Sequence, residues 1–227
     1  MPQIPKEWKG IRICDTLGNI CPQKEYYGSI QNMCEDCLYL NVFTTNINKV
    51  NKLPVMVWIH GGGLNMGTGF KKNSDGSEFA RNGVILVSIN YRLGQLGFLA
   101  HPALSKESER SVSGNYSFLD QIRALKWIKQ NISAFGGDPN NVTIFGESAG
   151  GTSISVLCSS KLAKGLFQKA IIQSPWMFGF MRKAAYPNIS YLKKSLANVS
   201  SGESLGEEWA NKYVEKGDKD VLKKLRQ

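Results

Sequence analysis

Residues 141–151 read Asn141-Val142-Thr143-Ile144-Phe145-Gly146-Glu147-Ser148-Ala149-Gly150-Gly151. A short apolar run of β-forming residues leads directly into a G-x-S-x-G pattern, which is typical of a nucleophile elbow between a strand and a helix. Such a turn strains the backbone of the serine, and the glycines two residues before and after it remove Cβ atoms that would collide. The hydroxyl of Ser148 would then lie at a helix N-terminus, where backbone N–H groups favour negative charge. The pattern predicts a nucleophilic serine.

A second glycine-rich stretch, Ile59-His60-Gly61-Gly62-Gly63, follows an apolar run. It matches the H-G-G-G loop whose N–H groups stabilise the oxyanion in acyl transfer, and the N–H of Ala149 would add a further donor. Each such donor typically lowers the barrier by about 2.7–4 kcal/mol. A flexible turn or a phosphate-binding loop is the alternative. The elbow that comes later in the sequence favours the oxyanion interpretation.

A serine hydroxyl needs a base, and the sequence marks none. The two histidines are His60 and His101, and neither follows Ser148, although elbow-containing hydrolases have the order serine, acid, histidine. We expect His60 to anchor the glycine loop and His101 to lie in a loop or at the surface. Four acidic residues after the serine are candidate acids in polar, helix-like segments, and nothing marks one as the orienting acid: Glu203, Glu207, Asp218 and Asp220.

Three other charged residues near these motifs have testable roles. Glu147 either supports the site by tuning charge or positioning water, or is a buried, hydrogen-bonded structural carboxylate. We favour a supporting role and do not assign it as the triad acid. Arg92 and Asp120 are expected to form a buried ion pair between a strand end and a long helix, and losing one partner of such a pair is severely destabilising.

The composition limits the function classes. The chain has 227 residues and a formal net charge of +10, but its basic residues are scattered and no nucleic-acid-binding motif accompanies them. We therefore expect a solvated basic surface and no nucleic-acid partner. No apolar run has the length of a transmembrane helix, and the first eight residues lack the apolar stretch of a signal peptide. Oligomeric state is not determined by these features.

The chain has five cysteines. The stretch from Cys34 to Cys37 has the spacing of half a zinc site, but Cys14 and Cys21 are poorly spaced to complete it. A disulfide within this N-terminal cluster is the better interpretation in an oxidising compartment. Cys158 is expected to be a small buried apolar residue.

The order of the expected elements indicates the fold class. Strands are expected at 38–44, 54–59, 83–90, 142–145 and 169–173, with the second and third buried on both faces. Helices are expected at 75–82, 117–132 and 149–158, and less regular helical segments at 191–199, 203–215 and 221–226. Alternating strands and helices predict a mostly parallel sheet flanked by helices on both faces.

Four segments together resemble the type-B carboxylesterase/lipase family, which includes the cholinesterases: residues 35–42, 54–63, 90–99 and 114–151. The resemblance covers about residues 7–175 and implies an α/β-hydrolase fold truncated after the nucleophile half. Residues 1–227 would form a partial domain that lacks its N-terminal strands and C-terminal half, including the triad acid and histidine.

The resemblance also implies roles for individual residues. Ser148 would be the acylated nucleophile, and Gly62, Gly63 and Ala149 would give the oxyanion-hole amides, with Glu147, His60 and Gly61 in support. Cys21 would pair with Cys37, which would favour a secreted or luminal location; without that bond a cytoplasmic one is expected.

The implied function is hydrolysis of a small carboxylic ester through an acyl-serine, without metal or cofactor. This chain alone would be inactive or weakly active. A non-catalytic binding protein of the same fold is the main alternative, and a truncated product that folds poorly is a third. Retention of Ser148 with Gly61–Gly63 favours the enzyme.

Overall fold

The structure is a computed structural model that describes residues 2–4, 9–10, 13–23, 32–45, 47, 52–70, 74–176, 192–193 and 200–226. The chain divides into two compact units. The first contains residues 1–94 and 117–176, and the second contains residues 95–116 and 177–227. The expectation of one partial domain over 1–227 stays a prediction. The helix expected at 191–199 lies almost entirely outside the described residues.

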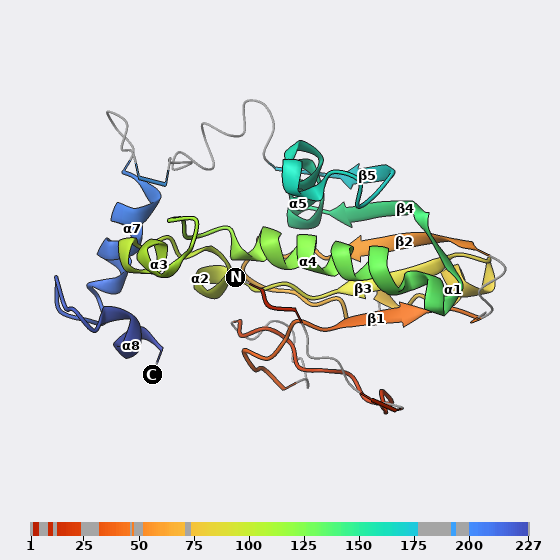
Figure 1. The fold of residues 1–227 in the computed structure, drawn as a ribbon, viewed down its shortest axis with the longest axis horizontal. Helices are drawn as coiled ribbons and strands as arrows, with labels where there is room; N and C mark the ends of the chain where they lie inside the picture. The colour runs from red at the N-terminus through yellow and green to blue at the C-terminus, as the bar shows by residue number, and fades with distance from the viewer. Residues whose placement is uncertain are drawn as a thin grey trace. The chain divides into compact units, whose positions relative to one another are not determined.

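The first unit is built on a five-stranded sheet. Its strands are β1 (Leu40–Phe43), β2 (Leu53–Ile59), β3 (Ile85–Ile89), β4 (Gly137–Glu147) and β5 (Lys169–Gln173). They lie in the order β1-β3-β2-β4-β5, with β1 antiparallel to β3 and every other pair parallel (Figure 1). The mostly parallel α/β sheet predicted from the sequence is confirmed. β4 begins earlier than predicted, because Gly137 already pairs with Leu53 ahead of a register shift.

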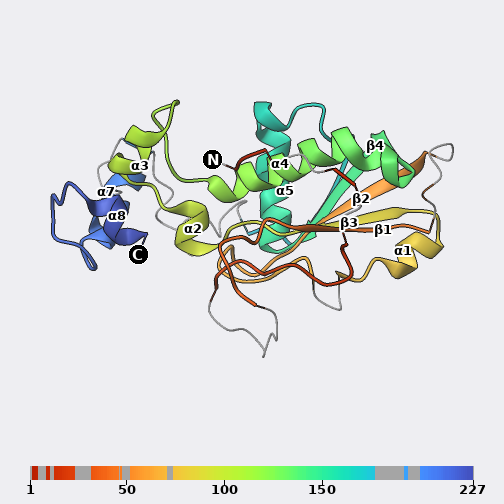
Figure 2. The same cartoon turned by 60° about the horizontal axis from the view of Figure 1, so that its bottom comes forward.

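Helices flank this sheet. α4 (Tyr116–Asn131) and α5 (Ala149–Ser159) lie on the same face (Figure 2), where the Gln121 Nε2 of α4 donates to the Ser153 Oγ of α5 at 3.2 Å. The shorter α1 (Ser77–Arg81) contacts β1 and β3. Two 3-10 turns, η2 (Ile132–Phe135) and η3 (Lys161–Ala163), follow α4 and α5. The helices α1, α4 and α5 are those that the sequence pattern predicted at 75–82, 117–132 and 149–158.

The apolar core contains residues of the sheet, α4 and α5. The helical period of α4 buries its apolar positions almost completely, at Ile122, Leu125 and Ile128. On β2 the alternate residues Val55, Val57 and Ile59 are fully buried, while Met56 and Trp58 are only half-buried. The expectation that β2 is buried on both faces is therefore wrong, because one face is less completely covered. β3 is buried at every position, as predicted.

The second unit contains four short helices: α2 (Gly94–Phe98, which begins at the boundary), α3 (Pro102–Glu107), α7 (Gly202–Ala210) and α8 (Val221–Leu225). α7 ends five residues earlier than predicted. His101 is 6% exposed, and its Nδ1 accepts a hydrogen bond from the Ala103 N–H at 3.0 Å. The expectation that His101 lies in a loop or at the surface is confirmed for the loop, because His101 is the N-cap residue that precedes α3. The residue is not at the surface, because its ring caps the first turn of that helix.

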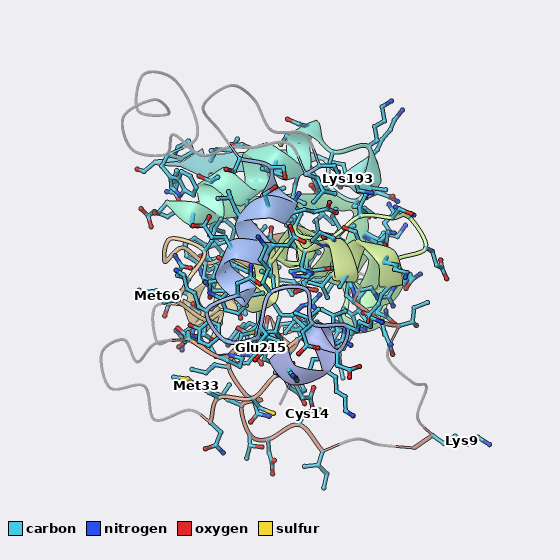
Figure 3. The ribbon with its side chains drawn as sticks, turned by 90° about the vertical axis from the view of Figure 1, so that its left-hand side faces the viewer. Lys9, Cys14, Met33, Met66, Lys193 and Glu215 are labelled. Atoms are coloured by element: carbon cyan, nitrogen blue, oxygen red, sulfur yellow. A yellow bond between two sulfur atoms is a disulfide. The ribbon has the colours of Figure 1, made fainter. Side chains whose placement is uncertain are left out.

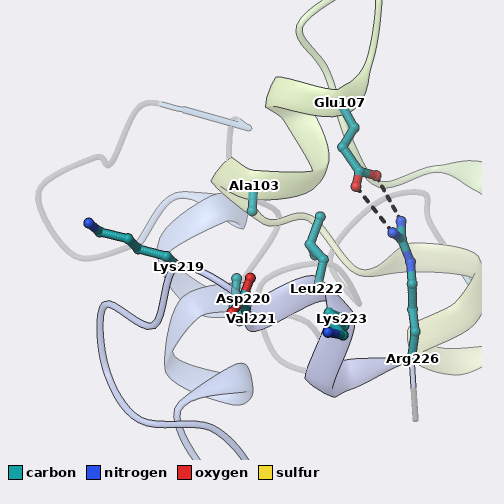
Figure 4. A pocket seen from close by; sticks show the side chains of 8 residues that line it. All are labelled: Ala103, Glu107, Lys219, Asp220, Val221, Leu222, Lys223 and Arg226. Atoms are coloured by element: carbon teal, nitrogen blue, oxygen red, sulfur yellow. Dashed lines mark hydrogen bonds and ion pairs between the residues drawn. The ribbon is translucent and has the colours of Figure 1, made fainter.

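A pocket of about 400 Å³ lies between α3 and α8 within this unit (Figure 4). Arg226 makes two hydrogen bonds to the Glu107 carboxylate there, at 2.7 and 3.1 Å. These bonds hold the pKa of Glu107 below its ordinary value. Both side chains are largely exposed, so the pair adds little stability. The residues that line the pocket include no serine, cysteine or histidine.

The ion pair predicted between Arg92 and Asp120 is present in the first unit. Asp120 is on α4, and its side chain is 1% exposed, while that of Arg92 is 23% exposed. The Arg92 Nε and Nη2 donate to the two carboxylate oxygens at 2.8 and 2.6 Å, and the Arg92 backbone N–H donates at 3.1 Å. The pair joins the segment after β3 to the first half of α4.

Replacing Asp120 with Asn should lower the free energy of unfolding by about 3 kcal/mol, because the guanidinium is left partly buried without a counter-charge. Urea unfolding measures the change. Glu78→Gln is the matched control, since it breaks the exposed Glu78–Arg81 pair of α1 and should cost less than about 0.5 kcal/mol. Equal effects of the two substitutions would contradict the assignment.

The turn from β4 into α5 is packed against the end of β2. A Cβ atom added at Gly150 would lie 2.1 Å from the Ile59 carbonyl oxygen, and one added at Gly146 would lie 2.5 Å from the same oxygen. No side-chain rotation relieves these contacts, because the atom that is met is backbone. The two glycines of the motif are therefore required by backbone-to-backbone packing.

Gly150→Ala should destabilise the first unit by about 3 kcal/mol or more, since overpacking against backbone exceeds the helix-propensity gain of about 1 kcal/mol. Gly63→Ala is the control. That glycine has φ 63° but nothing within 4 Å of an added Cβ, so about 1–2 kcal/mol of backbone strain is expected. Thermal unfolding of the two variants tests the order; a larger loss for Gly63→Ala would refute it.

Candidate active site

Ser148 connects β4 to α5 in a strained conformation. Its φ and ψ are 55° and −120°, and a non-glycine residue in such a region costs on the order of 1–3 kcal/mol. The backbone is fixed on both sides: the Ser148 N–H donates to the Gln173 carbonyl of β5, and its carbonyl accepts from the Thr152 N–H, each at 2.9 Å. The side chain is half-buried. This is the geometry that the motif predicts for a nucleophile elbow.

The glycine loop lies directly against this elbow. A Cβ added at Gly61 would be 3.3 Å from the Ser148 Cβ and 2.8 Å from the Glu147 carbonyl oxygen. Gly62 and Gly63 follow with φ of 107° and 63°. In the described part of the chain, neither of their N–H groups donates to a backbone carbonyl.

Ala149 lies next to Ser148 at the start of α5. It is the first residue of α5 and is fully buried. The first N–H groups of a helix have no partner within the helix and carry its positive dipole end. The structure therefore brings Ser148, the glycine loop and the start of α5 together. The oxyanion-hole role of Gly62, Gly63 and Ala149 stays a prediction.

His60 is held firmly within the loop. It is 5% exposed, and its ring stacks on Tyr91 with centroids 4.1 Å apart and planes at 10°. Its Nδ1 lies 2.8 Å from the Gly61 carbonyl oxygen. A carbonyl only accepts, so Nδ1 carries the hydrogen in this arrangement. These contacts suit a residue that anchors the loop.

Two residues that the sequence did not single out also fix the loop. The buried Tyr91 hydroxyl donates to the His60 carbonyl at 2.5 Å, and burial raises the pKa of Tyr91, which keeps the hydroxyl protonated. Gln23 binds the backbone of Gly67 twice: its Oε1 accepts from the N–H at 2.7 Å and its Nε2 donates to the carbonyl at 2.9 Å. Neither contact has a sequence signal, because both join segments far apart in the chain.

Among the acidic candidates, Glu147 is exposed, so the alternative of a buried structural carboxylate is wrong. A supporting role for Glu147 stays a prediction. Glu203 accepts from the Ser105 Oγ at 2.5 Å within the second unit. Asp218 pairs with Lys224, and that hydrogen bond lowers the pKa of Asp218. Both carboxylates thus have local partners.

Cys21 and Cys37 form a disulfide, as the family resemblance implied, and both are buried. The bond links residues 16 positions apart, a loop for which the chain-entropy estimate is about 3 kcal/mol. Cys158 is exposed. The expectation of a buried Cys158 is wrong, because Ile154 and Leu157 occupy the core-facing positions of α5.

The described residues contain no cluster of three or more histidine, cysteine, aspartate or glutamate side chains with metal-binding geometry. No helix within the same residues combines the length and apolar content needed to cross a bilayer.

Comparison with known proteins agrees with this geometry. The chain is 48% identical over 180 residues to fumonisin B1 esterase of Sphingopyxis macrogoltabida and 50% identical over 179 residues to para-nitrobenzyl esterase of Bacillus subtilis. These matches cover 77% and 76% of this chain but 33% and 36% of the relatives. The chain spans about a third of the length of the relatives that it matches.

A solved structure supports the same assignment. Carboxylesterase EST55 of Geobacillus stearothermophilus, solved at pH 6.2, matches 73% of this chain and 34% of its own with a TM-score of 0.67 and 44% identity. Residues 1–222 match the model of the carboxylesterase family. The chain therefore belongs to the carboxylesterase family.

Proposed function

We propose that this chain carries the nucleophile and the oxyanion hole of a carboxylic ester hydrolase that works through an acyl-serine. The observation that carries the proposal is the strained Ser148 at the start of α5, with the glycine loop packed against it. The names of the two curated relatives, which describe them as esterases, support the same reaction class. The substrate is a small carboxylic ester.

In the proposed reaction, the Ser148 Oγ attacks the ester carbonyl carbon and the carbonyl oxygen becomes an oxyanion. The N–H groups of Gly62, Gly63 and Ala149 donate to that oxygen, and the dipole of α5 adds favourable field. Collapse of the intermediate expels the alcohol and leaves the acyl group on Ser148, and water then releases the acid. These N–H donors lower the barrier because they face the oxygen on which negative charge develops in the transition state.

The base for the first step does not come from His60. Its Nδ1 is engaged with Gly61, and its ring is stacked on Tyr91. The other histidine, His101, caps α3 in the second unit. We infer that the 227-residue chain alone turns over esters weakly, and that full activity requires a histidine, which this sequence does not supply after Ser148, together with an acid that orients it.

A chimera tests the proposed nucleophile. Residues 1–175 of this chain would be fused to the complementary part of the Bacillus subtilis relative, with which the chain is 50% identical, and treated with a fluorophosphonate probe. Labelling is expected in the chimera and should be lost in Ser148→Ala. The control Ser133→Ala changes an exposed serine of η2 and should keep the label.

The 227-residue chain provides the second half of this test. Its hydrolysis of p-nitrophenyl acetate should stay close to the Ser148→Ala background, because no base activates the hydroxyl. Robust Ser148-dependent turnover by the isolated chain would overturn the inference about the base. A folded chimera that takes up no probe would favour the non-catalytic binding protein instead.

Tyr91→Phe tests how the loop is anchored. The change keeps the ring that stacks on His60 but removes the donor to its carbonyl, which should cost about 1–3 kcal/mol of unfolding free energy. In the chimera, probe labelling should also slow, since the glycine loop loses a fixed point. Unaltered stability and labelling would show that the stack alone holds the loop.

A further inference from the structure

Cys21 is related to two other cysteines, one by a bond and one by strand register. It is bonded to Cys37, and the register of a short β-bridge places it opposite Cys34. The evidence is an isolated parallel β-bridge between Ile20 and Met33. Its two hydrogen bonds run from the Ile20 N–H to the Asn32 carbonyl at 3.0 Å and from the Cys34 N–H to the Ile20 carbonyl at 3.1 Å. The next pair in this parallel register is Cys21 opposite Cys34.

The bridge stops at this pair for a covalent reason. The next hydrogen bond would have to run from residue 22 to the Cys34 carbonyl, and Pro22 has no N–H. Paired strands lie about 4.7–4.9 Å apart, which falls inside the Cα–Cα range of about 4.4–6.8 Å that disulfides need. Side chains at paired positions leave the same side of the strands. Cys34 is thus in register to bond Cys21.

The three sulfurs differ in accessibility. Cys21 and Cys37 are 1% and 0% exposed and belong to the apolar core, whereas Cys34 is exposed and carries a free thiol. A reagent in solution therefore meets Cys34 before it meets the disulfide. Cys34 and Cys37 are separated by two residues, so Cys21 can exchange one partner for the other without a large movement of the chain.

We propose that Cys34 is a thiol–disulfide exchange site for the Cys21–Cys37 bond. The Cys34 thiol loses its proton to solvent and the thiolate attacks the Cys21 sulfur. A Cys34–Cys21 bond forms as the Cys21–Cys37 bond breaks, and Cys37 leaves with the electron pair and takes up a proton. The step is an isomerisation and consumes no oxidant or reductant. Its product is a more exposed disulfide that solution thiols reach directly.

Exchange would also act on the glycine loop, a consequence that rests on the proposed function. Gln23 is two residues from Cys21, and its amide donates to both the Cys21 and the Gly67 carbonyls, at 3.1 and 2.9 Å. A Cβ added at Gly67 would lie 2.4 Å from the His60 Nδ1, so this backbone is in close contact with the anchor of the loop. Moving Cys21 toward Cys34 displaces this support.

The pairing is tested in Cys37→Ser. The reduced variant is oxidised with oxidised glutathione and its disulfides are mapped by peptide mass spectrometry after trypsin, which cuts at Lys24 between Cys21 and Cys34. Cys21–Cys34 should be the main product. In Cys37→Ser/Cys34→Ser, Cys21 should remain a thiol or a glutathione adduct.

Cys14, which lies with Met33 in the lower part of the view in Figure 3, is the competing thiol. A dominant Cys14–Cys21 bond, or an unpaired Cys21 beside a free Cys34, would overturn the proposal.

A kinetic measurement covers the case in which Cys37→Ser folds poorly. The 227-residue chain is exposed to limiting dithiothreitol, and alkylation of Cys37 is followed over time. Reduction should be about tenfold slower in Cys34→Ser, because a positioned neighbouring thiol is replaced by a bimolecular attack on a buried bond. Cys14→Ser should match the unsubstituted chain. Equal rates for Cys34→Ser and Cys14→Ser would contradict a relay through Cys34.

These readouts do not depend on ester hydrolysis, so exchange can succeed or fail separately from the proposed function. The coupling to the loop is measured in the chimera, as fluorophosphonate labelling in glutathione buffers of increasing reducing power. Labelling of the chimera should fall as the buffer becomes more reducing. In the Cys34→Ser variant, the same fall should require a more reducing buffer. If peptide mapping shows exchange but labelling stays constant in the chimera and in its Cys34→Ser variant, the coupling between the disulfide and the glycine loop is refuted.

Discussion

The contact of the β4–α5 turn with the end of β2 is the constraint on which the candidate site depends. Both flanking glycines face the Ile59 carbonyl, at distances where no Cβ can be accommodated. That carbonyl immediately precedes the glycine loop, so the same contact places the nucleophile and the loop side by side. Parallel pairing of β4 with β2, which matches Gly146 to Ile59, sets this position. The register of the sheet therefore determines where the serine and the glycine loop lie relative to each other.

Buried and half-buried polar contacts also hold the loop in place. The Tyr91 hydroxyl, the His60 ring and the Gln23 amide each satisfy backbone groups that the glycines leave exposed to the interior. Unsatisfied polar groups in such a place are costly, so each partner restricts the loop. Restricting it in advance is useful to catalysis, because donors that are already oriented need no reorganisation when the oxyanion forms.

Much of this was predictable from sequence because it depends on local patterns. The elbow, the parallel sheet and the long helix follow from glycine spacing, apolar runs and the 3.6-residue period around Ile122 and Leu125. The burial of His101, the exposure of Cys158 and the alternation of β2 were not predicted, because burial depends on which neighbours cover a residue. The Gln23–Gly67 contact joins residues 44 positions apart, and a single sequence contains no signal for such a pair.

The N-terminal segment also contacts the residues that follow β3, through hydrogen bonds of Asn90. The Asn90 side chain donates to the Cys37 and Asn19 carbonyls at 3.2 and 3.3 Å and accepts from the Gly69 N–H at 2.9 Å. One amide thus joins both ends of the disulfide region to the strand that follows the glycine loop. A movement of Cys21 would therefore be opposed by the hydrogen bonds of Asn90, and it would reach the Gly67 backbone through the side chain of Gln23. The proposed exchange at Cys34 would act on the loop through Gln23, whereas the contacts of the β4–α5 turn with Ile59 do not involve this segment.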